Sequence, residues 1–302
     1  MDRSLSSEEQ QSIAHYDALI SQFLAMDAEV NAGRAAWLWP KILAATYPAL
    51  ASLSINRMIL SLLVRGLRNQ SSRCNGQLLD FVEIFAGAGW LTHEMLRGGF
   101  LGVAFDYVMN ASHDVLNSCG LRLVLNAVCQ IRKFGLCWLA TPCSSFTVLC
   151  RCQSRRMPEN GYLGEADGYN FVKTGNYLME ISSLIYFLCY LLSIWVALEQ
   201  PQNSCMMDCA SLKGVALYCN AKRYLTYMGS FGGPTVKPLQ ILSTWEKLRG
   251  LERPRPSMVE AESLVVRSEK GFTGRKDLLH QSQVYTQLFG CAVCEICQAD
   301  WQ

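Results

Sequence analysis

The sequence lacks any pronounced excess of charge of one sign. Its 302 residues include 27 basic and 25 acidic residues, which leave a formal net charge of +2. A broad phosphate-binding face or a polybasic membrane anchor needs a larger basic excess, so any contact with nucleic acid must be local. Half of the residues are apolar, enough for one large α/β domain with appendages, and this composition excludes global disorder.

The sequence also lacks internal repeats, low-complexity segments and the charged, apolar and small-residue regions of a signal peptide. Its 14 cysteines, several of them within apolar stretches such as residues 187–190, are therefore expected to be reduced thiols in an intracellular protein. This composition does not distinguish the nucleus from the cytoplasm, and it indicates no oligomeric state.

Charge is absent from residues 181–198, a stretch whose length would allow a membrane helix. Its last residues, Trp195 to Leu198, are β-prone and lead directly into Glu199-Gln200-Pro201, where the proline would interrupt a helix. We predict a buried helix that leads into a buried strand, and no insertion into a membrane.

Residues 1–73 are predicted to form an N-terminal helical extension. Ser6 and Glu9 have the spacing of a capping box, and a periodic apolar face follows them. That face consists of Ile13, Tyr16, Ile20, Phe23 and Leu24. Two further helices are expected at the apolar residues 37–43 and 55–67, and a polar linker at residues 68–73.

From residue 78 onward, strands and helices are predicted to alternate. The predicted strands are residues 79–84, 101–105, 113–116, 136–140 and 194–198, and the helices between them are residues 88–96, 121–131 and 178–192. Such βα units imply a mostly parallel sheet with helices on both faces, an α/β Rossmann-like domain over residues 74–250. Residues 251–302 are predicted to form a C-terminal extension with a closing helix from about 277 to 297.

The segment Phe85-Ala86-Gly87-Ala88-Gly89 follows a predicted strand and precedes a predicted helix. Glycines at such a junction let the backbone approach a ligand closely and leave the helix N-terminus free to face it. Asp106 ends the next predicted strand, where a carboxylate can accept hydrogen bonds from ribose hydroxyls. The pattern predicts a nucleoside-cofactor site; the alternative is a tight turn with a surface aspartate.

Residues 82–90 resemble the first motif of the cytosine-5 DNA methyltransferases, whose glycine loop holds S-adenosylmethionine (SAM). The resemblance implies a SAM-dependent methyltransferase fold with SAM as cofactor. It also implies that Asp106 contacts the SAM ribose and that Asp114 lies near the adenine. The expected cofactor-binding residues are Phe85, Ala86, Gly87, Ala88, Gly89, Trp90, Asp106, Tyr107, Asp114 and Pro142.

The segment Thr141-Pro142-Cys143-Ser144-Ser145-Phe146 is similar to the family's Pro-Cys motif, and the resemblance implies that Cys143 is the nucleophile. Addition of its thiolate to carbon 6 of cytosine makes carbon 5 nucleophilic toward a methyl group, and loss of the carbon-5 proton then expels the thiolate. In the following loop, Arg151, Arg155 and Arg156 are candidates for lowering the thiol pKa or holding phosphates.

Glu199-Gln200-Pro201 resembles the family's Glu-Asn motif, with glutamine in place of asparagine. The resemblance implies that Glu199 contacts the ring nitrogen and exocyclic amine of a flipped cytosine. The alternative is a carboxylate that merely ends a strand. Substrate contacts are expected from Ser144, Ser145, Arg151, Gln200 and Pro201.

Some features of the family are missing. No Gln-x-Arg-x-Arg motif occurs near residues 226–243, which resemble instead a segment of atypical methyltransferase-like proteins of protists and phages and predict a strand, a glycine turn and a strand. The residues after Ser243 leave little room for a target-recognition domain, and they match none of the family's late motifs. The resemblance therefore covers roughly residues 78–245.

The spacing of Cys291, Cys294 and Cys297 predicts one face of a helix. A closed zinc site needs a fourth ligand, and no partner pair stands at a standard spacing, so we predict a buried apolar face and no metal.

The leading functional hypothesis is a SAM-dependent methyltransferase acting on cytosine in DNA or RNA, with Cys143 and Glu199 as catalytic residues. The alternatives are a catalytically inactive scaffold or a methyltransferase with a protein or small-molecule substrate.

Overall fold

The computed structural model describes residues 6, 7, 10, 11, 14–18, 21, 78–256, 265–268, 271–274 and 283–301. Several predictions lie outside the described residues: the helices at 37–43 and 55–67, the linker at 68–73, the apolar positions 13, 20, 23 and 24, and residues 277–282 of the closing helix.

The protein is built around a six-stranded sheet with the strand order β2-β1-β3-β4-β6-β5. The strands are β1 (Leu79–Ile84), β2 (Gly102–Phe105), β3 (Ile131–Leu139), β4 (Trp195–Pro201), β5 (Lys222–Tyr227) and β6 (Pro238–Ser243). The first four are parallel, and β6 pairs antiparallel with both β4 and β5. The prediction of a mostly parallel α/β sheet is confirmed, and the arrangement is compatible with a Rossmann-like fold. A separate two-stranded sheet joins β7 (Val265–Ser268) and β8 (Gly271–Gly274).

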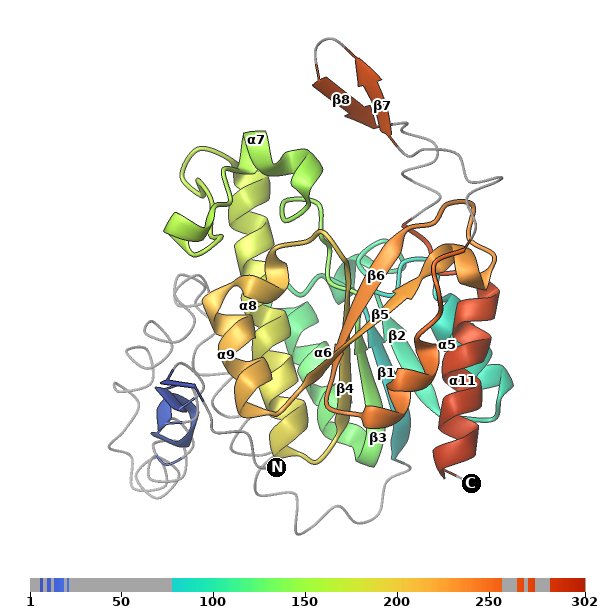
Figure 1. The fold of residues 1–302 in the computed structure, drawn as a ribbon. Coiled ribbons are helices and arrows are strands. Elements are labelled where there is room, and N and C mark those ends of the chain that lie inside the picture. Colours follow the sequence, from blue (N-terminus) through green and yellow to red (C-terminus); the bar gives the residue numbers. More distant parts are fainter. Residues whose placement is uncertain are drawn as a thin grey trace.

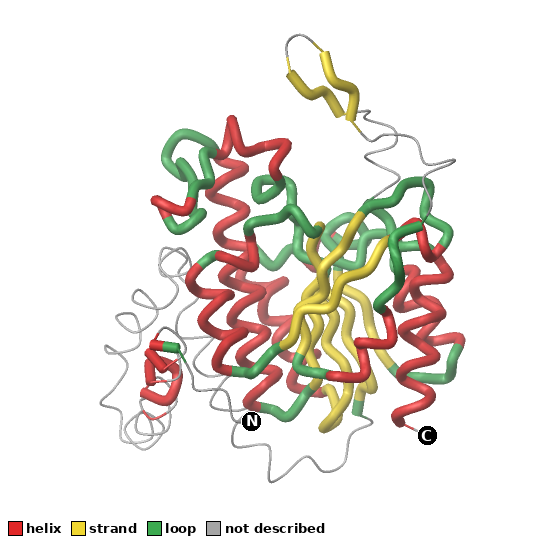
Figure 2. The backbone as a smooth tube through the Cα atoms, viewed as in Figure 1, coloured by secondary structure: helices red, strands yellow, loops and turns green. Residues whose placement is uncertain are grey.

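Helices cover both faces of the six-stranded sheet (Figure 1). One face carries α6 (Ser118–Gln130), α8 (Asn170–Leu191) and α9 (Ala210–Tyr218), and the other carries α5 (Trp90–Arg97) and α11 (Gln287–Trp301). The short α7 (Arg151–Ser154) lies in the long connection between β3 and α8, which is mostly loop (Figure 2). Side chains alternate along each strand, so that Val82 and Val196 enter the core under α6 and α8 while Phe81 and Trp138 enter the core under α11.

The charge-free stretch at residues 181–198 forms the end of α8 and the start of β4, as the sequence predicts. Nearly every residue of this segment of α8 is buried, because the helix is covered by neighbouring helices as well as by the sheet. Among the described residues, no helix combines the length and apolar composition that a membrane crossing requires.

Tyr16 shows where the described part of the N-terminal extension docks. Its ring is 2% exposed and packs on Phe187 of α8 and Tyr218 of α9, with ring centroids 5.0 and 5.3 Å away. Its hydroxyl donates to the carbonyl of Ser211 at 3.2 Å. The apolar face predicted from the sequence therefore contacts the helical layer of the domain at this position.

Two predicted elements are wrong in type or extent. Residues 113–116 form no strand: Ala111–His113 is a turn of 3₁₀ helix, because Asn110 caps its first turn and Asp114 accepts a hydrogen bond from the amide of Leu116. Residues 283–286, which the sequence assigned to the closing helix, are not helical: α11 begins at Gln287, where the Thr286 hydroxyl accepts the hydrogen bond of the Phe289 amide and acts as the helix cap.

Candidate active site

The three sequence motifs meet at the carboxyl ends of adjacent parallel strands. The chain leaves β1 for β2 on one side, whereas β3 pairs with the other side of β1. Ligands of open α/β sheets bind at such a topological switch point, outside the carboxyl ends of the strands. Phe85 follows β1, the Pro142-Cys143 pair follows β3, and Glu199 lies near the end of β4, so this edge of the sheet collects the candidate residues.

The glycine loop between β1 and α5 has a backbone conformation that the sequence explains. Gly87 and Gly89 have φ values of 55° and 71°, and Gly89 is the N-terminal cap of α5. A side chain is strained in this region, which glycine occupies freely. Phe85 also has a positive φ, of 64°, without being glycine. Strained residues of this kind cluster at ligand sites, which supports a binding role for the loop.

A cavity of about 400 Å³ opens beside this loop, within the size range of small-molecule sites. It is lined mainly by apolar groups from the ends of β1 and β2, the 3₁₀ turn, the Pro-Cys loop and α8. From the predicted cofactor set it contains Phe85, Asp106, Tyr107, Asp114 and Pro142, and from the predicted substrate set Ser144. The predicted residues Ala86, Gly87, Ala88, Gly89 and Trp90 do not line it.

Asp106 joins the first two strands at the cavity. One carboxylate oxygen accepts from the amide of Gly87 at 2.9 Å, and the other accepts from the amide of Val108 at 2.8 Å. A carboxylate has about four acceptor positions, so Asp106 can hold the loop and still accept from a ligand hydroxyl.

Several residues of this cavity lie outside the motifs from which the site was predicted. His113 lines it with a buried Nδ1 that has no hydrogen-bond partner among the described residues. Phe171, Thr174 and Leu178 enter it from one side of α8, a spacing that marks one helix face but does not by itself indicate a ligand. The cavity thus combines apolar walls with two carboxylates and an imidazole, groups that suit a ribose and a purine ring.

Cys143 lies between two cavity-lining residues, Pro142 and Ser144, and is half-buried. Burial and the negative charge of Glu199 raise the pKa of its thiol to about 11, while the positive charge of Lys237 opposes this rise. Lys237 precedes β6 and also lowers the pKa of Glu199. This lysine is not among the site residues predicted from the sequence, although it lies within the segment that carries no arginine motif.

Two of the three arginines that follow Cys143 make their contacts within the protein. Arg156 is 1% exposed and donates hydrogen bonds to Ser145 and Asn176, among others, while its guanidinium stacks on Phe146. Arg155 pairs with Glu165 at 2.6 Å. These two arginines tie the loop to α8 and to itself. Arg151 is exposed and stays a candidate for contact with a substrate.

Glu199 accepts a hydrogen bond from a tyrosine that comes 86 positions later in the sequence. The Tyr285 hydroxyl donates to Oε2 of Glu199 at 3.0 Å, and Nε1 of Trp138 donates to the Tyr285 oxygen at 3.1 Å. Oε1 of Glu199 is buried without a partner among the described residues. Burial raises the pKa of Glu199, whereas Lys237 and the hydrogen bond from Tyr285 lower it. Tyr285 is another residue that the sequence analysis missed.

Gln200 and Ser145 face the protein rather than the edge of the site. The Gln200 amide donates to the carbonyl of Thr141 at 2.6 Å and accepts from the hydroxyl of Ser204 at 2.8 Å. Ser145 is 1% exposed and accepts a hydrogen bond from Arg156. Both side chains were predicted to contact the substrate directly, whereas the structure shows them buried and hydrogen-bonded to the protein itself.

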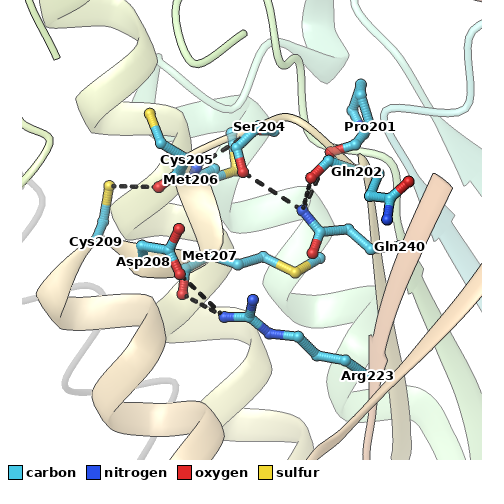
Figure 3. Close-up of polar contacts among 10 residues, drawn as sticks. All are labelled: Pro201, Gln202, Ser204, Cys205, Met206, Met207, Asp208, Cys209, Arg223 and Gln240. Atoms are coloured by element: carbon cyan, nitrogen blue, oxygen red, sulfur yellow. Dashed lines mark hydrogen bonds and ion pairs between the residues drawn. The ribbon is translucent and has the colours of Figure 1, made fainter. Parts of the chain in front are cut away.

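Figure 3 shows how the loop after β4 is fixed. The Gln240 amide, on β6, points into this loop and donates to the carbonyl oxygens of Pro201, Gln202 and Ser204 at 3.1, 3.4 and 3.4 Å. Arg223 reaches the same loop from β5 and contacts Asp208 at 3.3 Å. The antiparallel strands thereby stabilise the loop that follows Glu199.

The cysteines of α11 lie away from this site. Cys294 and Cys297 are buried in the apolar cluster between α11 and the sheet, and Cys291 is half-buried. Within the described ranges, no group of three or more histidine, cysteine, aspartate or glutamate side chains is arranged to hold a metal ion.

Comparison with protein-family models finds no match to this chain, and a search of curated proteins finds none either.

Proposed function

We propose that the protein is a SAM-dependent methyltransferase that acts on cytosine in DNA or RNA. The observation that carries the proposal is the meeting of three motifs, separated in sequence, at one edge of the sheet beside the cavity that contains Asp106 and Asp114. The resemblance of these motifs to cytosine-5 DNA methyltransferases supplies the chemistry.

The cavity residues suit SAM as the cofactor. Asp106 is available to ribose hydroxyls, and the apolar walls suit the purine ring. Asp114 is available to the adenine nitrogens, as is the Nδ1 of His113, which has no hydrogen-bond partner among the described residues. When bound, SAM would supply an electrophilic methyl group. Cys143 would add as a thiolate to carbon 6 of cytosine, and Glu199 would hold the ring nitrogen and amine while charge develops on the ring. The carbon-5 proton would leave to water before the thiolate is expelled.

Calorimetric titration with SAM tests the first half of the proposal. Asp106→Asn keeps an acceptor for one backbone amide and removes the charge, so we expect binding by the wild type and at least a tenfold weaker affinity in the variant. Asp208→Asn, on the exposed loop after β4, is the matched control and should bind as the wild type does. Absence of SAM binding by the folded wild type would overturn the proposal.

A second candidate is a SAM-binding protein that performs no covalent catalysis. The elevated pKa of Cys143, about 11, favours it, because little thiolate is present at neutral pH. Incubation with SAM and an oligonucleotide containing 5-fluoro-2′-deoxycytidine separates the two candidates. The fluorine cannot leave as the proton does, so the covalent enzyme would be trapped at Cys143, whereas Cys143→Ser would not. If methyl transfer persists in Cys143→Ser, the substrate belongs to another class.

A further inference from the structure

The strongest unexplained feature of the site is the buried chain Trp138–Tyr285–Glu199, which joins β3, the segment before α11 and β4. Its members lie far apart in the sequence: Tyr285 comes 147 positions after Trp138 and 86 positions after Glu199. All three are at least 93% buried, with exposed fractions of 0, 7 and 6%. The chain ends at Oε1 of Glu199, a polar atom with no partner among the described residues.

The chemistry of the donors fixes the direction of these hydrogen bonds. The indole N–H of Trp138 can only donate, so the Tyr285 oxygen accepts from it. The single hydroxyl proton of Tyr285 is then directed to Oε2 of Glu199, which acts as an acceptor. If Oε2 carried a proton and donated instead, the buried hydroxyl proton of Tyr285 would lose its partner, at a cost of about 1–3 kcal/mol. Once a bound ring places an acceptor nitrogen at Oε1, which has no other partner among the described residues, a proton on Oε1 is the arrangement that gives both buried hydroxyl protons an acceptor.

We propose that Tyr285 is a positioning residue that places the proton of Glu199 on Oε1, so that the carboxyl group selects a ring with an acceptor nitrogen beside an amino group. Oε1–H would donate to the ring nitrogen, and Oε2 would accept from the amine. Cytosine has this edge, whereas uracil has an N–H and a carbonyl at the same places. The inference rests on the proposed function and deepens it, because it explains how the site distinguishes the two pyrimidines.

The groups around Glu199 are compatible with a neutral carboxyl group. Burial raises its pKa, and the Cys143 thiol is a neighbour whose own pKa is raised by the Glu199 charge. Lys237 acts in the opposite direction, as does the Tyr285 hydrogen bond. Burial raises the pKa of Tyr285 well above its usual value, and the nearby carboxyl groups of Glu199 and Glu83 add to this rise, so the phenol stays protonated as a donor.

Infrared spectroscopy of the ligand-free protein tests the position of the proton. The carboxylic C=O band that disappears in Glu199→Gln belongs to Glu199. A hydrogen bond accepted at Oε2 lowers the frequency of this band. We expect this band to move to higher frequency in Tyr285→Phe, which keeps the ring and removes the hydroxyl. The control is Tyr186→Phe, since the Tyr186 hydroxyl is buried in the other core without a partner among the described residues. An unmoved band, or no band that depends on Glu199, would overturn the inference.

The second test compares two single-stranded oligonucleotides, one with 5-fluoro-2′-deoxycytidine and one with 5-fluoro-2′-deoxyuridine, in the presence of SAM. We expect the wild type and Tyr186→Phe to form the covalent adduct mainly with the fluorocytosine oligonucleotide. In Tyr285→Phe the ratio of the two adduct rates should fall on the order of tenfold, the size of one lost directional hydrogen bond. An unchanged ratio in a folded Tyr285→Phe would refute the inference. If the wild type is trapped by neither oligonucleotide, the proposed function fails, and the infrared comparison decides the role of Tyr285 by itself.

Discussion

The side-chain amide of Gln200 donates a hydrogen bond to the main-chain carbonyl of Thr141 at 2.6 Å, so one contact joins the loop that carries Cys143 to the strand that carries Glu199. The Gln200 side chain is completely buried, and its amide oxygen accepts a hydrogen bond from the Ser204 hydroxyl. The distance between the candidate nucleophile and its partner carboxyl group therefore depends on a residue that contacts neither cavity nor solvent.

Removal of this link should destabilise the protein. In Gln200→Ala, the carbonyl of Thr141 and the hydroxyl of Ser204 lose a buried partner and a small cavity remains, so we expect a loss of about 2–4 kcal/mol in the free energy of unfolding. Urea denaturation followed by circular dichroism measures it. Gln202→Ala, at an exposed position in the same loop, should change the free energy by less than about 0.5 kcal/mol. Equal effects of the two substitutions would contradict the structural role of Gln200.

Filling the cavity should block SAM without unfolding the domain. Thr174 is half-buried on the cavity side of α8, so the larger ring in Thr174→Phe would occupy part of the space of about 400 Å³. We expect at least a tenfold loss of SAM affinity by calorimetry, with a change in unfolding free energy of about 1 kcal/mol or less. Thr174→Val keeps the size and removes the hydroxyl. If it binds as weakly as Thr174→Phe, the loss is due to the hydroxyl rather than to the filled volume.

Lys237 should control the reactivity of Cys143. Its charge opposes the rise of the thiol pKa, so Lys237→Met should raise that pKa further above about 11. Each added pKa unit lowers the thiolate fraction about tenfold at any pH below this value. Alkylation with iodoacetamide tests this. Mass spectrometry of the peptide that contains Cys143 distinguishes the alkylation rate of this residue from those of the other cysteines among the 14.

The exposed Lys222 on β5 provides the control, and Lys222→Met should leave the Cys143 rate unchanged. A faster reaction in Lys237→Met would show that the lysine shields the thiol more than it activates it.

Glu83 should make stability depend on pH. It is fully buried in β1, and burial raises its pKa from 4.5 to about 7, although hydrogen bonds from the amide and hydroxyl of Thr92 oppose the rise. Because the folded protein binds this proton more tightly than the unfolded chain, the contribution to stability is complete below pH 4.5. It is lost as the pH rises through about 7, a difference of roughly 3 kcal/mol.

Glu83→Gln should remove this dependence. Unfolding free energies should be measured from about pH 4 to about pH 8, which covers the titration of Glu83. They should fall less steeply with rising pH for the variant than for the wild type. Glu159→Gln, at an exposed position, should keep the wild-type slope. Parallel curves for Glu83→Gln and the wild type would mean that Glu83 titrates alike in the folded and unfolded chains.

The sequence by itself determined the alternation of strands and helices and the position of the glycine loop. Both follow from local patterns: apolar stretches of strand length, and glycines at φ values that other residues adopt only with strain. It also placed Asp106, the Pro-Cys loop and Glu199 at strand ends, which a parallel sheet brings to one edge. Its errors at residues 113–116 and at the start of α11 come from side-chain caps that compete with strand and helix periodicity.

Only the tertiary structure decided which other residues complete the site. Tyr285 reaches Glu199 because α11 packs on the face of the sheet opposite to α8, and Lys237 affects Cys143 because β6 returns antiparallel beside β4. The same packing turns Arg156 inward, where hydrogen bonds to five acceptors compensate for its burial. Contacts of this kind depend on how distant segments meet, and no local spacing in the chain encodes that meeting.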